Sequence, residues 1–143
     1  MKSTTRIKVR GYHCDFYGHV NNARYLELLE EARWCLLEEG LDLAYWKDRN
    51  MGFIVASISI NYRRPAPLGA VLEIHSELAR LGGRSGIIRQ EVVNADTGKT
   101  VADADVTFVV VDLRTGKPLA MEGEVKAGFD LIEKCPGGRK DQD

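Results

Sequence analysis

The chain has 143 residues, of which 44% are hydrophobic and 29% are charged, so we expect one domain with a buried core. Twenty basic residues nearly balance 21 acidic residues, and the net charge of −1 argues against nonspecific nucleic-acid binding. No apolar run approaches ~18 residues, the N-terminus lacks the apolar segment of a signal peptide, and three irregularly spaced cysteines favour a reducing cytoplasm over a disulfide framework.

The first predicted elements are a short strand over residues 6–12 and a long helix that ends at Gly40. Asn21 or Asn22 is a suitable N-cap, because a short side-chain oxygen can accept a hydrogen bond from the first turn. A further helical turn is expected over residues 42–50. Apolar residues at helical spacing predict the side of the long helix that faces the core, namely Tyr25, Leu28, Leu29, Ala32 and Leu36.

Beyond Gly52 the pattern changes to alternation, which predicts four consecutive strands. The apolar face of the first strand consists of Ile54, Ala56, Ile58, Ile60 and Tyr62, and two prolines follow it. The other strands are predicted at 72–78, 86–94 and 102–110, with turns at 81–84, 95–98 and 115–116. Three successive hairpins predict a mainly antiparallel sheet with one helix on one face.

A single helix covers only part of such a sheet. The other face, and an edge, are therefore expected to need a partner, for which a second copy of the chain is the natural choice. The last ~25 residues are expected to be peripheral, and the tail at about residues 134–143 is expected to be frayed.

The segment from Asp15 to Tyr25 carries the strongest functional signal. It places one acid in a glycine-containing loop that turns directly into the long helix. A helix start offers free N–H groups and a partial positive charge, so it holds an oxyanion well. A nearby carboxylate can supply a base or a nucleophile. The pattern indicates a site where both groups face the same ligand atom.

Over residues 6–120 the chain resembles the hotdog-fold acyl-CoA thioesterases of the 4-hydroxybenzoyl-CoA thioesterase type. The matching positions are Tyr12, Asp15, Gly18, Val20, Asn22, Tyr25, Glu30, Ala32 and Arg33, with support from residues 58–66, 68–69 and 84–85. The His-Val-Asn-Asn loop at 19–22 also looks like that of acyl-ACP thioesterases. The resemblance implies a single α+β domain over residues 1–143, with a long helix wrapped by a curved, mainly antiparallel sheet. It also implies dimers or tetramers with active sites at the subunit interface.

For Asp15 the resemblance implies the catalytic carboxylate, either as nucleophile on the thioester carbonyl or as general base toward water. The alternative is a loop aspartate that caps a nearby N–H. At Asn22 we expect the backbone N–H to hold the oxyanion, and the alternative is a simple N-cap. His19 can orient Asp15, position water or protonate the leaving thiolate, or it can serve only the structure of the loop.

Two positions depart from the family pattern. Many relatives carry Asp where this chain has Ala70, which we expect to affect the turn more than the chemistry. Some relatives carry His or Tyr at the position of Asn22, so a side-chain acid is in doubt there, whereas a backbone N–H is retained.

The substrate-binding candidates are Tyr25 for the acyl group and Arg84 and Arg64 for the phosphates of coenzyme A. Some relatives use basic residues of the hairpin that contains Arg84. The alternative for each arginine is a solvated side chain. Trp34 and Trp46 are further candidates for the acyl pocket.

Other reactive side chains near the loop are interpreted as structural. His13, Asp15 and His19 offer no visible fourth ligand, so no metal site is expected. Cys14 has no evident His–Asp relay and is expected to be a small, buried or half-buried residue. On the helix, Glu30 and Arg33 are three residues apart and can form an ion pair.

The sequence therefore predicts a cytoplasmic hydrolase that converts an acyl-CoA or acyl-carrier-protein thioester to free acid and thiol, without a cofactor or a nucleic-acid partner. A homodimer or homotetramer is expected, and acyl carrier protein is a candidate partner. Two other classes stay open: a noncatalytic acyl-thioester-binding protein, against which Asp15 argues, and an enoyl-thioester hydratase, whose His-based motif is not found. The fold alone does not choose among them.

Overall fold

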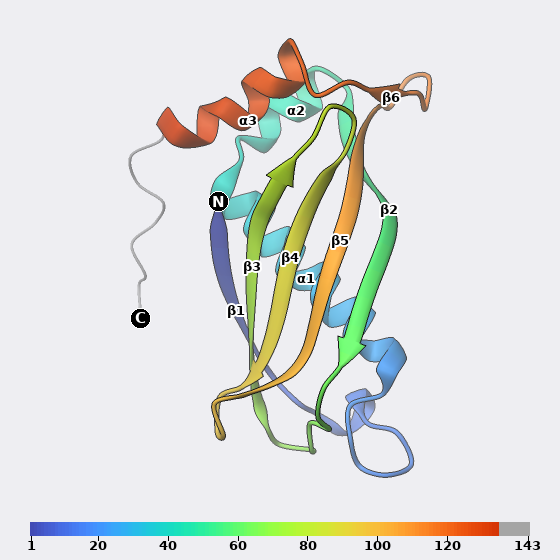
Figure 1. Cartoon of the computed structure of the whole chain (residues 1–143), viewed down its shortest axis with the longest axis vertical. Coiled ribbons are helices and arrows are strands. Elements are labelled where there is room, and N and C mark those ends of the chain that lie inside the picture. Colours follow the sequence, from blue (N-terminus) through green and yellow to red (C-terminus); the bar gives the residue numbers. More distant parts are fainter. Residues whose placement is uncertain (135–143) are drawn as a thin grey trace.

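The computed structural model describes residues 1–134 as a long helix wrapped by a curved antiparallel sheet (Figure 1). The predicted α+β class is confirmed. The tail that was predicted to be frayed lies outside the described residues, except for residue 134, which ends the last helix. Cys135 lies outside the described residues as well. The elements are β1 (Lys2–Lys8), η1 (Gly11–His13), α1 (Asn22–Gly40), α2 (Leu43–Asp48), β2 (Met51–Tyr62), β3 (Val71–Leu81), β4 (Gly86–Asn94), β5 (Lys99–Asp112), β6 (Pro118–Leu119) and α3 (Glu124–Lys134).

The start of α1 is as predicted, and the cap is Asn21. Its side chain accepts a hydrogen bond from the N–H of Ala23 at 2.9 Å. The short helical turn after α1 is also confirmed. The first strand, by contrast, begins and ends earlier than predicted, because Ser3 and Thr5 occupy inward positions opposite β3 and break the apolar alternation.

The sheet order β1-β3-β4-β5-β2 corrects the expectation of three successive hairpins. Hairpins join β3 to β4 and β4 to β5. β2 pairs with β5 instead of with β3, so the connection from β2 to β3 crosses from one edge of the sheet to the other side. Two prolines, Pro65 and Pro67, lie in the segment between β2 and β3. Proline supplies no N–H for a ladder, so this segment forms a loop and no tight turn.

A β-bulge changes the face of β2 that is apolar. Val55 is opposite Phe108 and Ser57 is opposite Thr107, so the residue between them has no partner on β5. The extra residue resets the alternation. Ile54 therefore lies on the opposite face from Ile58, and the prediction that they share a face is wrong.

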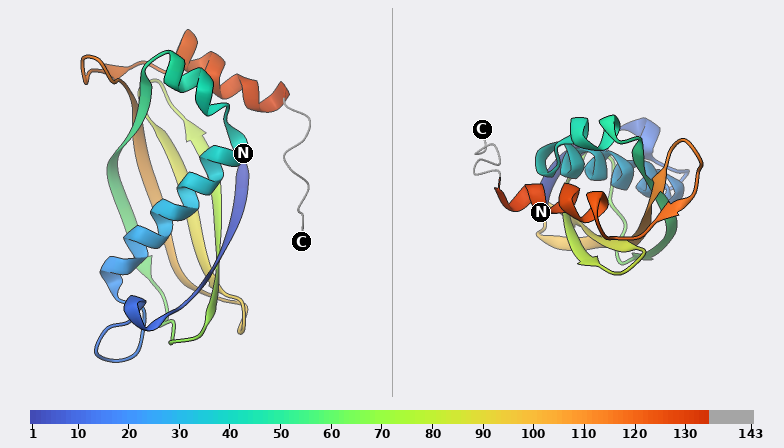
Figure 2. Two further views of the ribbon diagram at one scale, coloured as in Figure 1. Left: turned by 180° about the vertical axis from the view of Figure 1, so that it is seen from behind. Right: turned by 90° about the horizontal axis from the view of Figure 1, so that it is seen from above.

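The core has two parts, and α3 completes the second. Val125 and Phe129 of α3 are buried, and the rings of Phe129 and Trp46 lie 4.9 Å apart. Figure 2 shows α1 on one face of the sheet and α3 across one end of it. The expectation that the last residues are peripheral is therefore wrong for α3, which covers Trp46.

The outer face of the sheet is polar and ion-paired. Lys2 with Glu77, Arg6 with Glu73 and Arg89 with Asp105 form ion pairs of 3.7, 3.4 and 3.2 Å. The expectation that this face needs a partner stays a prediction. The β2 edge differs, because Ile54 and Val55 are exposed there.

Candidate active site

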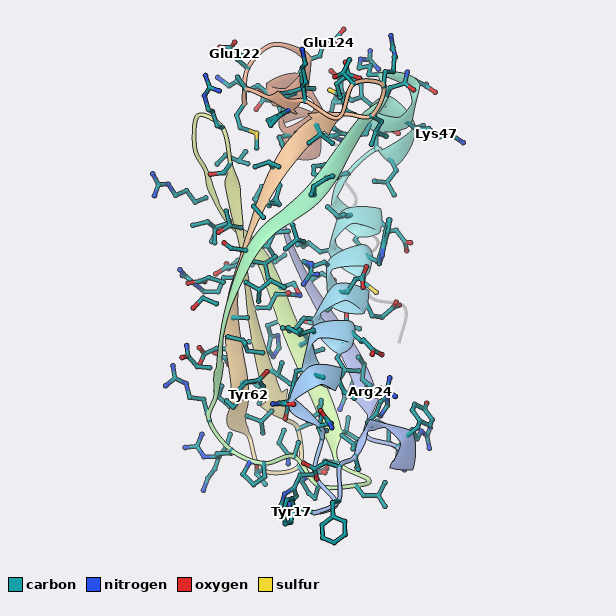
Figure 3. The ribbon with its side chains drawn as sticks, turned by 90° about the vertical axis from the view of Figure 1, so that its right-hand side faces the viewer. Tyr17, Arg24, Lys47, Tyr62, Glu122 and Glu124 are labelled. Atoms are coloured by element: carbon teal, nitrogen blue, oxygen red, sulfur yellow. The ribbon has the colours of Figure 1, made fainter. Side chains whose placement is uncertain are left out.

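The Asp15 loop lies at one end of the molecule, where β1 and η1 lead into α1 (Figure 3). Antiparallel bridges join Cys14 to Val20 and His19 to Pro67, so the loop is pinned to itself and to the β2–β3 loop. The N–H of Asp15 also donates to the carbonyl of His19 at 2.8 Å. Figure 3 shows Tyr17 at the extremity of this end, with Arg24 and Tyr62 nearer to the middle.

The two carboxylate oxygens of Asp15 have different surroundings. Oδ1 accepts hydrogen bonds from the N–H groups of Tyr17 at 2.9 Å and His19 at 3.4 Å. Within residues 1–134, Oδ2 has no hydrogen-bond partner. The capping role and the chemical role predicted as alternatives are thus compatible, because one oxygen orients the side chain while the other is available.

Asn22 is the first residue of α1 and is not its cap. Its N–H finds no acceptor in the described part of the chain, since the Asn21 side chain bonds to Ala23 instead. Its carbonyl accepts a hydrogen bond from the Tyr62 hydroxyl at 2.9 Å. The first turn of α1 therefore presents a free backbone donor at the positive end of the helix dipole.

A cavity of about 450 Å³ brings five of the six predicted site residues together. The wall residues are Asp15, His19, Val20, Asn22, Tyr25, Tyr62, Arg63, Arg64 and Pro65. Arg84 is the exception, because it belongs to the β3–β4 hairpin at the opposite end of the same chain (Figure 1). Its role in phosphate binding stays a prediction.

Tyr62 is a wall residue that sequence reasoning did not select as a site residue. Its ring lies 5.6 Å from the ring of Tyr25. Burial, with a smaller contribution from Tyr62, raises the pKa of Tyr25 to about 12. The available signal was the position of Tyr62 as the last residue of a strand, directly before Arg63-Arg64-Pro65.

The two arginines of this wall differ in their partners. Arg63 forms a 2.7 Å ion pair with Asp103, and hydrogen bonds from Arg63 and then Asn61 lower the pKa of Asp103. Arg64 donates to the carbonyl of Thr100 at 2.7 Å, and no carboxylate among residues 1–131 pairs with it. Arg64 is therefore the better of the two for an anionic ligand.

The neighbouring His13 and Cys14 lie outside the cavity wall. The His13 Nδ1 accepts a hydrogen bond from the N–H of Arg10 at 2.8 Å, and burial, followed by the charges of Arg24 and Arg10, lowers the pKa of His13. Cys14 is half-buried, as predicted, and its thiol donates to the carbonyl of Arg10. Among the described side chains of residues 1–131, no three His, Cys, Asp or Glu residues are grouped to hold a metal ion.

A larger, mainly apolar cavity of about 610 Å³ lies between α1, β2 and α2. Trp34, Trp46, Phe53 and Val55 are among its wall residues. Trp34 is 12 residues beyond Asn22, which corresponds to about 18 Å along the axis of α1. Both predicted tryptophans thus line one cavity, well separated from Asp15 along α1.

Arg33, at the wall of the apolar cavity, bonds to a partner that the sequence did not indicate. Its Nη1 donates to Oε1 of Gln90 at 3.1 Å, and Gln90 is fully buried. Burial lowers the pKa of Arg33, and the nearby charge of Glu30 opposes that effect. The possible Glu30–Arg33 ion pair does not form within the described chain.

Comparisons with known proteins show what the chain as a whole is similar to. A family model described as the thioesterase-like superfamily matches residues 9–129. The chain is 52% identical over 130 residues to the long-chain acyl-CoA thioesterase FadM of Escherichia coli (strain K12), covering 91% of this chain and 98% of that protein. It is 32% identical over 128 residues to the acyl-CoA thioester hydrolase YbgC of Escherichia coli O6:H1, covering 87% and 94%. The crystal structure of YbaW, a probable thioesterase from Escherichia coli, superposes with a TM-score of 0.84 at 51% identity, covering 90% of this chain and 97% of that one.

Proposed function

The chain belongs to the thioesterase-like superfamily and is a thioester hydrolase, and from this premise we propose that it converts long-chain acyl-CoA to a free fatty acid and coenzyme A. The observation that carries the proposal is that the available Asp15 Oδ2 and the free Asn22 N–H belong to residues that line the same cavity. The preference for long acyl chains rests on the 52% identity to FadM and on the size of the apolar cavity.

Asn22 is proposed to stabilise the charge that develops on the carbonyl oxygen. The thioester oxygen accepts a hydrogen bond from the Asn22 N–H as the carbonyl carbon becomes tetrahedral. The helix dipole of α1 adds to this effect, because its positive end points at the same oxygen. The Tyr62 hydroxyl supports the arrangement by bonding to the Asn22 carbonyl at 2.9 Å, which holds the first turn of α1 against β2.

Asp15 is proposed to act through Oδ2 by one of two balanced routes. As a nucleophile, Oδ2 bonds to the carbonyl carbon, the C–S bond breaks and a thiolate leaves, after which water hydrolyses the mixed anhydride. As a general base, Oδ2 takes a proton from water as the water oxygen bonds to the carbonyl carbon, and the tetrahedral intermediate then breaks its C–S bond and expels the thiolate. In both routes the thiolate ends protonated, and His19 is the wall residue suited to give that proton.

Arg64 is the proposed contact for a phosphate of coenzyme A, because no carboxylate of the described side chains pairs with it and it lies on the cavity wall. Tyr25 is proposed to contact the first part of the acyl group. The proposed chemistry needs only thioester and water, so we propose that no metal or cofactor takes part.

We also propose that two copies pair through their β2 edges. A long exposed strand edge with apolar side chains tends to pair with another strand. Antiparallel pairing would set the Met51 end of one β2 beside the Tyr62 end of the other. The apolar cavity and the Arg84 hairpin of one copy would then lie at the same end as the Asp15 loop of the second copy, as a shared active site requires. A tetramer of such dimers is the alternative assembly.

No helix within residues 1–134 has the length and apolar character to cross a bilayer. We propose a cytoplasmic location, which suits the free thiols of Cys14 and Cys35.

The test is thiol release from a panel of acyl-CoA esters by the parent and by Asp15→Asn. The substitution keeps an oxygen to accept from Tyr17 and removes the charge, so we expect a loss of kcat/KM of about 10²–10⁴-fold. Asp96→Asn, in the β4–β5 turn, is the matched control and should keep parental activity. An Asp15→Asn protein as fast as the parent would exclude the proposed chemistry, and loss of enoyl absorbance without thiol release would favour a hydratase.

A further inference from the structure

The extremity beside the site carries large apolar side chains that the chain itself leaves uncovered. Phe16, Tyr17 and Leu68 are 96%, 78% and 60% exposed. The N–H of Leu68 donates to the carbonyl of Gly18 at 3.2 Å, so the two loops that carry these residues are joined. Figure 3 shows Tyr17 close to the extremity of this end. We call these three residues the apolar tip.

The apolar tip is poorly suited to a stable protein interface. Such an interface takes roughly 20–30 residues from each partner, whereas the tip is a convex end with three large apolar side chains. The surface better suited to a second copy is the β2 edge, which offers a twelve-residue strand. The tip is better suited to a partner that can accommodate a few protruding side chains without having a pocket shaped to them.

The charges around the tip have one predominant sign. Lys8, Arg10 and Arg64 are exposed, and among the described side chains of residues 1–131 none of them forms an ion pair with a carboxylate. Lys8 ends β1 and Arg10 precedes η1, so both are next to the loop that carries Phe16. The acid of this loop, Asp15, turns one of its oxygens toward backbone N–H groups. The whole chain, by contrast, has a net charge of −1.

We propose that the apolar tip docks onto the surface of an anionic lipid bilayer. Aromatic and aliphatic side chains insert among the headgroups and upper acyl chains, while basic side chains next to them meet the negative surface potential. The cavity lined by Asp15 and Asn22 then faces the bilayer. A long-chain acyl thioester is amphiphilic, so one dissolved in the membrane would reach the cavity from the lipid side.

The experiment is flotation of the full-length protein with vesicles, without any substrate. Vesicles of phosphatidylglycerol mixed with phosphatidylethanolamine are compared with vesicles of phosphatidylcholine alone. We expect binding to the anionic vesicles, and weaker binding at ~1 M salt, where the Debye length falls to about 3 Å. Binding is measured apart from hydrolysis, so its failure would leave the proposed function standing.

The matched variants are Phe16→Ser with Tyr17→Ser for the tip, and Leu81→Ser for an exposed apolar residue outside the tip, at the end of β3. The tip variant should lower the partition coefficient at least about tenfold, since each inserted side chain contributes through its buried apolar area, while Leu81→Ser should match the parent. Thermal unfolding checks that both variants are folded. Phe16→Trp provides a second measurement, because its added fluorescence should be quenched by brominated anionic lipid.

Three results would overturn the proposal. The first is a parent protein that does not float with anionic vesicles at high lipid concentration. The second is equal flotation by the parent and a folded tip variant, with no added quenching for Phe16→Trp. The third is a tip variant that binds lipid as well as the parent does but has altered self-association or altered binding of acyl carrier protein. The tip would then be a contact for a protein.

Discussion

At the scale of single residues, the proposed oxyanion donor belongs to the backbone. Asn22 stands at the first position of α1, where proline is well tolerated because no intrahelical acceptor exists for its N–H. The preceding residue, Asn21, already has an extended backbone with φ of −62° and ψ of 137°, as a residue before proline prefers. Replacement by proline can therefore remove the donor while leaving the helix.

We expect Asn22→Pro to lower kcat by about 10²–10³-fold, the effect typical of a lost oxyanion donor. Asn22→Ala keeps the N–H and is the matched control, which should stay within a few-fold of the parent. Steady-state thiol release gives kcat, and the melting temperature verifies the fold. If Asn22→Ala lost as much activity as Asn22→Pro, the side chain would be the important group.

The residues of the site were predictable to different degrees. Asp15 and Asn22 could be selected because loop and helix start are adjacent in the chain, so local sequence fixes their relation. Tyr62 reaches the same cavity from the end of β2, 40 residues after Asn22, and only the folded sheet brings it there. The Arg33–Gln90 contact was missed for the same reason, since Gln90 lies on β4, 57 positions away.

At the scale of elements, a buried polar network joins α1 to the sheet. The Gln90 Nε2 donates to the carbonyl of Leu29 at 3.0 Å and to the Ser76 Oγ at 2.9 Å, while its Oε1 accepts from Arg33. Gln90 and Ser76 are both buried. The side-chain amide of Gln90, on β4, thus supplies hydrogen-bond partners to polar groups of both α1 and β3. These bonds fix how the helix lies on the sheet.

We expect Gln90→Leu to lower the free energy of unfolding by about 1–3 kcal/mol, because Arg33 and Ser76 lose a partner in a poorly hydrated place. Urea unfolding measures the change. Adding Arg33→Met should recover part of the loss, since an apolar pair replaces an unsatisfied cation. Additive losses in the double variant would mean that the contact contributes little.

The elements also show where periodicity succeeds and where it fails. The apolar stripe of α1 is buried as predicted, because one helix face meets one sheet face. The alternation of β2 misleads after Ile54, since a bulge adds a residue that no local pattern announces. α3 was overlooked as a core element, although Val125 and Phe129 are four residues apart as on one helix face.

At the scale of the whole molecule, the order of the strands along the chain predicts only part of their order in the sheet. The two hairpins with tight turns, β3–β4 and β4–β5, were predictable from glycine-containing turns. The pairing of β2 with β5 was not, because it joins segments separated by two other strands. The β2 edge left by this order is where we expect the second copy.

We expect Val55→Lys to convert a dimer into a monomer, because a charge would be buried without a partner at the paired edge. Glu91→Lys places the same side chain on the exposed outer face of β4 and should leave the dimer intact. Light scattering during size-exclusion chromatography gives the masses. A parent that is monomeric, or a Val55→Lys protein that stays dimeric, would contradict the proposed edge.

The strand order also matters while the protein is being synthesised. β1 pairs with β3 and β2 pairs with β5, so each strand made before residue 63 waits for a partner made after residue 70. The hairpins β3–β4 and β4–β5 are local and can form quickly, whereas the outer strands require distant contacts, which slow folding. A nascent chain therefore carries the apolar sides of α1 and β2 uncovered until β5, which ends at Asp112, has left the ribosome. During that interval the growing chain would be a substrate for chaperones that bind exposed apolar segments.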